Sequence, residues 1–201
     1  MDKKFFVMAI VGLFLTLPVA MQAQRADLYK VANIKRFEAD NKEVPAKAKK
    51  EKRVVFMGNS ITEGWARVHP EGLKENNYYG RGISGQTSPQ MLLRFQADVI
   101  ALQPDVVVIN AGTNDIAENT GTYHPSFTLN NIKSMAEVAK ANGIKVILTS
   151  VLPHDRFGWN KSIENVTQKV DELNVAIQAY AKANKIPYVD YHSAMTDSEG
   201  G

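Results

Sequence analysis

The 201-residue sequence contains no cysteine. Without thiols, the chain can form no disulfide and no cysteine-ligated metal site, and it offers no cysteine for the lipid anchor of a bacterial lipoprotein. Histidine is also scarce, with four residues in the whole chain. No group of histidine and carboxylate residues has the spacing of metal ligands, so we predict no metal site.

Long hydrophobic runs are absent except near the N-terminus. Residues 1–23 combine two lysines, an apolar run before Pro18 and small residues ending at Ala23. A membrane-spanning helix needs roughly 20 apolar residues, and this run is shorter. The layout is typical of a secretory signal peptide. We therefore predict export to the periplasm or the medium, cleavage after Ala23 and no stable membrane association afterwards.

Charge of one sign is not in clear excess, since 24 basic residues stand against 21 acidic ones. The one basic cluster, residues 47–53, is short and is typical of a solvated connector. A nucleic-acid-binding protein needs a broader basic face with interleaved aromatic residues. We therefore predict no nucleic-acid partner.

Strand and helix patterns alternate along the rest of the chain. Residues 24–52 read as an N-terminal helix, over 25–42, and a basic connector, and residues 53–201 as one α/β domain. The expected strands cover residues 54–57, 76–84, 104–112, 145–153 and 186–192. The expected helices cover residues 88–102, 129–142 and 163–184. This alternation predicts a parallel five-stranded sheet between two helical layers, with right-handed crossovers.

Polar loops follow the expected strands, at the edge where ligands bind in such sheets. Ser60 follows the first strand, Gly85 the second and Asn114 the third. Each has a simpler interpretation alone: a helix cap, a turn glycine and a turn former. Together, the Ser60 N–H, the Gly85 N–H and the Asn114 side chain would form three donors around an oxyanion. A phosphate or nucleotide binder is the weaker alternative, because the glycines match neither known fingerprint.

The segments GNSIT, GRGISGQT and GTND resemble the first three motif blocks of the SGNH, or GDSL, hydrolases. The likeness covers residues 30–199 and is greatest to exported bacterial acylhydrolases and carbohydrate esterases. It implies a flavodoxin-like α/β/α fold, no cofactor, and a serine esterase with Ser60 as nucleophile and Gly85 and Asn114 in the oxyanion hole. The expected substrate is a small-molecule or carbohydrate ester with a short acyl group such as acetyl. A lysophospholipase or thioesterase is the alternative within the family.

The family's Asp-x-x-His block, which supplies the base, is absent from the 201 residues. None of His69, His124, His154 and His192 has an aspartate three residues earlier. One explanation is that the sequence is truncated before that block and before a closing C-terminal helix, so that the domain at 53–201 is incomplete. Alternatively, His192 or His154 replaces the missing base, or the chain is a non-catalytic carbohydrate-binding relative.

Five residues are candidates for substrate contact: Asn59, Asp115, His154, Trp159 and His192. Trp159 is the favoured contact, because aromatic faces suit sugar rings, although packing is its alternative role. Asn59 stands where the family name expects aspartate, and it keeps the turn-forming amide. Asp115 is expected to orient the Asn114 loop, and the two histidines are expected at the rim.

Overall fold

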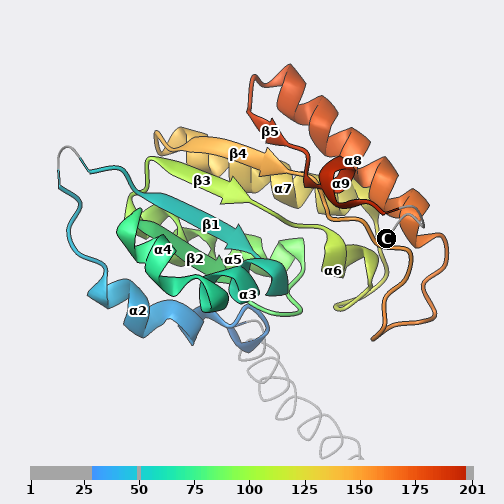
Figure 1. Cartoon of the computed structure of the whole chain (residues 1–201), viewed down its shortest axis with the longest axis horizontal. Coiled ribbons are helices and arrows are strands. Elements are labelled where there is room, and N and C mark those ends of the chain that lie inside the picture. Colours follow the sequence, from blue (N-terminus) through green and yellow to red (C-terminus); the bar gives the residue numbers. More distant parts are fainter. Residues whose placement is uncertain (1–28, 49–50, 198–201) are drawn as a thin grey trace, which may run out of the picture.

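The computed structural model describes residues 29–48 and 51–197, which form three layers (Figure 1). The expected signal peptide lies outside these residues, and the predicted division into signal, N-terminal segment and domain stays a prediction. A parallel sheet of five strands lies between helices on both faces. The predicted fold class, a parallel α/β sandwich, is confirmed.

The sheet has the strand order β2-β1-β3-β4-β5, and every pair is parallel. The strands are β1 (Val54–Gly58), β2 (Tyr78–Gly82), β3 (Val106–Ile109), β4 (Lys145–Thr149) and β5 (Tyr188–Val189). This is the order of flavodoxin-like sheets, whose ligand crevice opens between β1 and β3, where the chain reverses its direction of winding. The carboxyl ends of β2, β1 and β3 are therefore neighbours at the edge where the polar loops lie.

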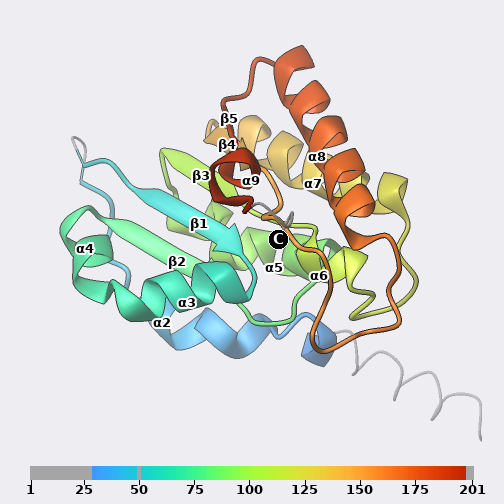
Figure 2. The ribbon, with the colours of Figure 1, turned by 45° about the vertical axis from the view of Figure 1, so that its right-hand side comes forward.

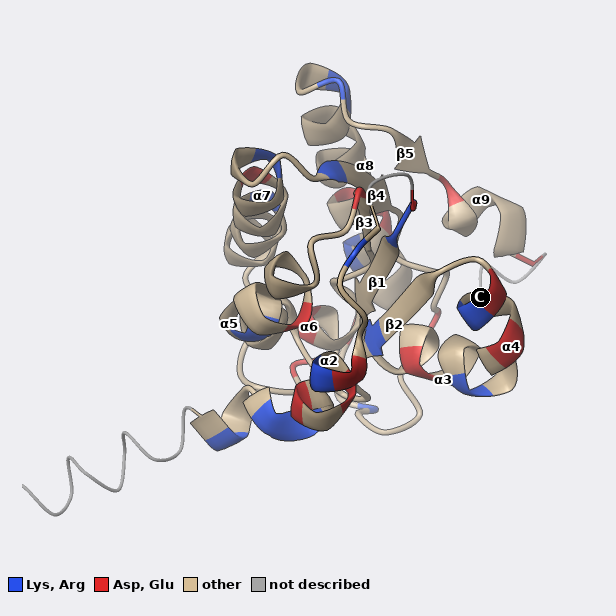
Figure 3. Cartoon of the chain, turned by 90° about the vertical axis from the view of Figure 1, so that its left-hand side faces the viewer, with Lys and Arg blue, Asp and Glu red and all other residues tan. Residues whose placement is uncertain are grey.

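The helices divide between the two faces of the sheet (Figure 2). One face is covered by α5 (Ser88–Asp98), α7 (Pro125–Ala141) and α8 (Val166–Ala183), and the other by α3 (Ser60–Val68) and α4 (Pro70–Glu75). The short elements are η1 (Ile34–Phe37), α2 (Glu38–Glu43), η2 (Ile100–Leu102), α6 (Thr113–Ile116) and α9 (Tyr191–Met195). Basic and acidic residues alternate along α2, α3 and α4 without forming a region of one sign (Figure 3).

The main core lies between the sheet and the layer of α5, α7 and α8. Alternate strand residues such as Val55, Val107 and Leu148 are fully buried there against Phe95 and Leu173. The other face is covered by α3 and α4 only over β1 and β2. Among residues 29–48 and 51–197, no helix is both long and apolar enough to cross a bilayer.

The sequence predicts a single helix over residues 25–42, and this prediction is wrong over residues 29–42, which are the part that the structure describes. Asn33 adopts the left-handed conformation, with φ of 50°, and separates a helical turn from η1 and α2. The carbonyls of Val31 and Ala32 accept hydrogen bonds from the side chains of Gln90 and Gln86. A continuous helix would use those carbonyls internally, so tertiary contacts replace helical ones at this point.

The expected strand over residues 186–192 is also wrong at its end. Only Tyr188 and Val189 pair with β4, and α9 begins at Tyr191. The Asp190 side chain accepts a hydrogen bond of 2.9 Å from the Ser193 N–H, which caps the helix. His192 therefore lies in a helix and not at the end of a strand.

Candidate active site

Ser60 is the first residue of α3 and is exposed, directly after the carboxyl end of β1. The preceding residue, Asn59, is 1% exposed, and its Oδ1 accepts a hydrogen bond of 3.0 Å from the Ile61 N–H. Asn59 is thus the helix cap, which is the role that was considered for Ser60. The Ser60 hydroxyl is not needed for capping and lies at the surface of the sheet edge.

Gly85 lies in the loop after β2 and is also exposed. Its φ is +77°, a left-handed conformation that glycine adopts without strain. An added Cβ would meet only the Asn119 Nδ2 atom, at 3.8 Å, so conformation and not crowding favours glycine here. The same Nδ2 donates to the Gly85 carbonyl at 3.0 Å, which helps to fix the orientation of the loop.

Asn114 lies in α6, after β3, and is 3% exposed. Its Nδ2 donates to the Gln86 carbonyl at 2.9 Å, so the structure joins the third loop to the second. A carboxamide nitrogen carries two hydrogens, and this bond uses one of them. The expected oxyanion role would use the second hydrogen.

Asp115, next to Asn114, is 7% exposed. Its carboxylate accepts hydrogen bonds from the N–H and hydroxyl of Ser88 and from the Thr128 hydroxyl. Burial raises the pKa of Asp115, and the bonds from Ser88 and Thr128 act in the opposite direction. Asp115 therefore ties α6 to the first turns of α5 and α7, and its expected role in orienting the Asn114 loop stays a prediction.

Glu63 joins α3 to the Gly85 loop. Its carboxylate accepts hydrogen bonds from the Ser84 N–H, at 2.8 Å, and from the Ser84 hydroxyl. The Ser84 hydroxyl lowers the pKa of Glu63, because these bonds favour the ionised carboxylate. The helix that begins with Ser60 is thus bound to the residue before Gly85.

Trp159 lies beside the Gly85 loop. Its Nε1 donates to the Asn119 Oδ1 at 2.9 Å, and Asn119 in turn binds the Gly85 carbonyl. The indole is 60% exposed, and its ring centroid lies 5.1 Å from that of the buried Phe157. An exposed aromatic surface held near the loop suits a ligand contact.

The two candidate histidines have different surroundings. The His154 ring centroid lies 5.3 Å from that of Phe157, and burial lowers its pKa. The His192 Nε2 lies 3.4 Å from the Asp171 Oδ1 on α8, and the backbone N–H of His192 donates to the Ser150 hydroxyl at 2.8 Å. These contacts join α9 to α8 and to the end of β4, and none of them involves Ser60.

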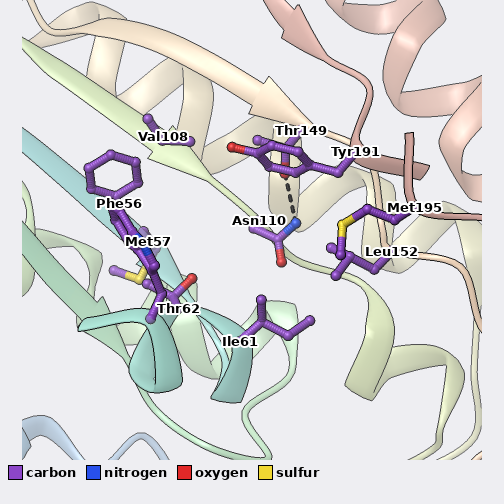
Figure 4. Close-up of a pocket in the computed structure, with 11 residues that line it drawn as sticks. Phe56, Met57, Ile61, Thr62, Val108, Asn110, Thr149, Leu152, Tyr191 and Met195 are labelled. Atoms are coloured by element: carbon purple, nitrogen blue, oxygen red, sulfur yellow. Dashed lines mark hydrogen bonds between the residues drawn. The ribbon is translucent and has the colours of Figure 1, made fainter. Parts of the chain in front are cut away.

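A cavity of about 270 Å³, which the sequence did not predict, lies on the sheet face between α3 and α9 (Figure 4). Its lining is mostly apolar: Phe56, Met57, Ile61, Thr62, Trp65, Val108, Asn110, Thr149, Leu152, Tyr191 and Met195. The Asn110 Nδ2 donates to the Thr149 hydroxyl, whereas its buried Oδ1 has no hydrogen-bond partner in the described structure. Ser60, Gly85 and Asn114 do not line it, so it adjoins the Ser60 turn only through Ile61 and Thr62. The alternation of side chains between the two faces of β1 and β3 is the sequence signal that could have indicated this cavity.

Comparisons with known proteins show to which family the chain is similar. A family model described as the GDSL-like lipase/acylhydrolase family matches residues 56–201. The crystal structure of a GDSL-like lipase from Bacteroides thetaiotaomicron is 60% identical, with a TM-score of 0.83 over 85% of this chain and 83% of that one. An acetylxylan esterase of Xylanibacter ruminicola is 26% identical over 189 residues, 77% of this chain and 39% of the esterase. An uncharacterized lipoprotein of Bacillus subtilis is 36% identical over 74% of each chain.

Proposed function

The chain belongs to the GDSL-like lipase/acylhydrolase family, a family of ester hydrolases, and from this premise we propose that it is an exported serine esterase. Its substrates are short acyl esters, acetyl above all, on carbohydrates. Ser60 is the nucleophile, and the Gly85 N–H, the Ser60 N–H and the Asn114 carboxamide form the oxyanion hole. No metal or cofactor takes part.

One observation carries the proposal: an exposed serine begins α3 beside two loops that offer hydrogen-bond donors. Asn59 caps the helix and leaves the Ser60 hydroxyl available. The Asn114 carboxamide is held against the Gln86 carbonyl, next to Gly85. Preorganised donors at the developing oxyanion are worth about 2.7–4 kcal/mol each in comparable enzymes.

The reaction follows acyl transfer. The Ser60 Oγ attacks the ester carbonyl carbon and loses its proton to a base, while the carbonyl electron pair moves onto the oxygen between the donors. The C–O bond to the alcohol then breaks, and the alcohol leaves with a proton. Water hydrolyses the acyl-serine in the same way, which releases the acid and regenerates Ser60.

The carbohydrate substrate is supported by the similarity to an acetylxylan esterase and by Trp159. The exposed indole, tied to the Gly85 loop through Asn119, would stack on a sugar ring next to the scissile ester. His154 and His192 complete the set of proposed contacts, whereas the buried Asn59 and Asp115 act indirectly, by capping α3 and by holding the Asn114 loop. Export is supported by the N-terminal signal pattern and by the similarity to a lipoprotein.

Two alternatives rest on specific observations. The apolar cavity beside Ile61 favours a lysophospholipase or thioesterase, because it would accept a longer acyl chain. The contacts of His192 with Asp171 and Ser150, none of which involves Ser60, favour a binding protein without a base. A comparable triad without its base retains only about 10³–10⁴-fold acceleration over water.

Hydrolysis of p-nitrophenyl acetate, butyrate and octanoate tests the proposal. We expect acetate to be preferred and Ser60→Ala to reduce turnover to the background rate. Ser162→Ala, at another exposed serine, should have no effect. A preference for octanoate would favour the lysophospholipase or thioesterase. Equal rates for wild type and Ser60→Ala, together with saturable binding of acetylated xylan oligosaccharides, would favour the binding protein. Loss of activity in His192→Ala or His154→Ala alone would identify the base.

A further inference from the structure

Arg94 is a fully buried arginine on α5 that contacts two of the three segments that carry the candidate site. Its Nη2 donates to the Gly58 carbonyl at 3.1 Å, and its Nε donates to the Gln86 Oε1 at 2.6 Å. Gly58 lies two residues before Ser60, and Gln86 directly follows Gly85. A single side chain therefore holds the end of β1 and the loop after β2 in a fixed relation.

Gln86 extends this contact to the third loop. Its carbonyl accepts the hydrogen bond from the Asn114 Nδ2, and its side-chain Nε2 donates to the Ala32 carbonyl at 2.9 Å. Gln86 is 4% exposed, so these bonds are shielded from water. The Arg94 guanidinium is thus one hydrogen bond away from the residue that holds the Asn114 carboxamide.

The third contact of Arg94 is an ion pair with Asp98, which favours the charged form of the guanidinium. Its Nη1 donates to the Asp98 Oδ2 at 3.0 Å, and neither side chain is exposed. Burial lowers the pKa of Arg94, and Asp98 acts in the opposite direction. Replacing buried ion pairs by apolar residues is often neutral for stability or even stabilising, so stability alone is a weak explanation for this pair. Three donors in one rigid plane can instead fix the directions of three partners, which lysine cannot do.

We propose that Arg94 is a positioning residue, whose guanidinium sets the spacing between the Ser60 turn and the donors at Gly85 and Asn114. This inference rests on the proposed function, because it concerns the same site. A misplacement of reacting groups by about 1 Å can cost about 10²-fold in rate. Loss of the clamp should therefore lower kcat and change KM little, since the substrate-contacting groups are still present.

Arg81 provides a matched control. It is a neighbouring arginine, 5% exposed, and its guanidinium lies over the same Phe37 ring, at 4.8 Å against 5.9 Å for Arg94. Its bonds go to the Asn41 Oδ1 and the Gly80 carbonyl, and not to Gly58 or Gln86. Arg81→Lys and Arg94→Lys should therefore lower the Tm to a similar degree.

The test compares kcat and KM for p-nitrophenyl acetate in both lysine variants, well below either Tm. We expect about a 10- to 100-fold lower kcat in Arg94→Lys, with KM within about twofold, and an unchanged kcat in Arg81→Lys. Equal kcat values for Arg94→Lys and wild type, or equal losses in both variants, would overturn the inference. If Arg94→Lys does not fold, Gln86→Met removes the same contact from the other side and should give the same drop in kcat.

Amide hydrogen exchange distinguishes this inference from the proposed function. If Ser60→Ala has no effect on turnover, the proposed nucleophile is wrong, whatever Arg94 does. Faster exchange of residues 58–62 and 83–86 in Arg94→Lys than in Arg81→Lys would still support the clamp between the loops. Equal exchange in the two variants would refute it.

Discussion

Gly82 is a position where one added methyl group should damage the candidate site through the backbone of α3. It ends β2 and pairs in register with Gly58, next to the first turn of α3. A Cβ at Gly82 would lie 2.3 Å from the Glu63 nitrogen and 2.5 Å from the Asn59 carbonyl oxygen. These two atoms form the first helical hydrogen bond of α3, at 3.0 Å. The Gly82→Ala methyl would therefore press directly against this bond.

The size of the effect follows from those distances. Ordinary contact begins at 3.4 Å, so α3 must move away from β2 by about 1.1 Å, which is 3.4 minus 2.3. The contacting atoms belong to the backbone, which cannot rotate away. Overpacking of this kind costs about 1–3 kcal/mol, and moving Ser60 by about 1 Å should lower kcat by about 10²-fold.

Gly64→Ala is the matched control on the same helix. A Cβ there would meet nothing within 4 Å, and Gly64 lies inside α3. Alanine in a helix is favoured over glycine by roughly 0.5–1 kcal/mol, so this variant should be more stable than wild type. Urea denaturation and p-nitrophenyl acetate turnover of both variants test the reasoning. A Gly82→Ala variant with wild-type stability and kcat would refute the close packing of α3 on β2.

Three further predictions concern the loops and the cavity. Asn114→Ala should lower kcat by about 10²–10³-fold with little change in KM, and a change confined to KM would contradict an oxyanion role. Because the pKa of Glu63 is lowered from 4.5, its bonds to Ser84 stabilise the fold above that value and are lost as the pH falls through the lowered pKa. The stability gap between wild type and Glu63→Gln, measured by urea denaturation, should therefore close below about pH 4.5 and not widen. A hydrophobic dye should bind the native chain at the apolar cavity, and Met195→Lys at the rim of the cavity should weaken this binding. A dye signal that appears only on unfolding would argue against an accessible cavity.

The sequence alone predicted the parallel α/β sandwich, because its signals are local. A continuous β-branched run such as Val106–Ile109 indicates a strand buried on both faces, and apolar spacing indicates the helices that cover it. The topology then places Ser60, Gly85 and Asn114 at one edge, since the ends of neighbouring parallel strands meet there. The position of these three residues could therefore be predicted without knowing any contact between side chains.

Only the tertiary structure decided which polar side chains are buried and what they hold. Arg94 lies in a helix pattern where an arginine is normally solvated, yet its contact with the Gly58 carbonyl spans 36 residues. The break at Asn33 and the helix that contains His192 likewise depend on partners such as Gln86, Gln90 and Ser150. Hydrophobic period is a property of consecutive residues, whereas a buried hydrogen bond needs two groups that folding brings together. Local sequence patterns therefore determined the strands and loops that carry the site. Packing between distant segments determined the contacts that position its side chains.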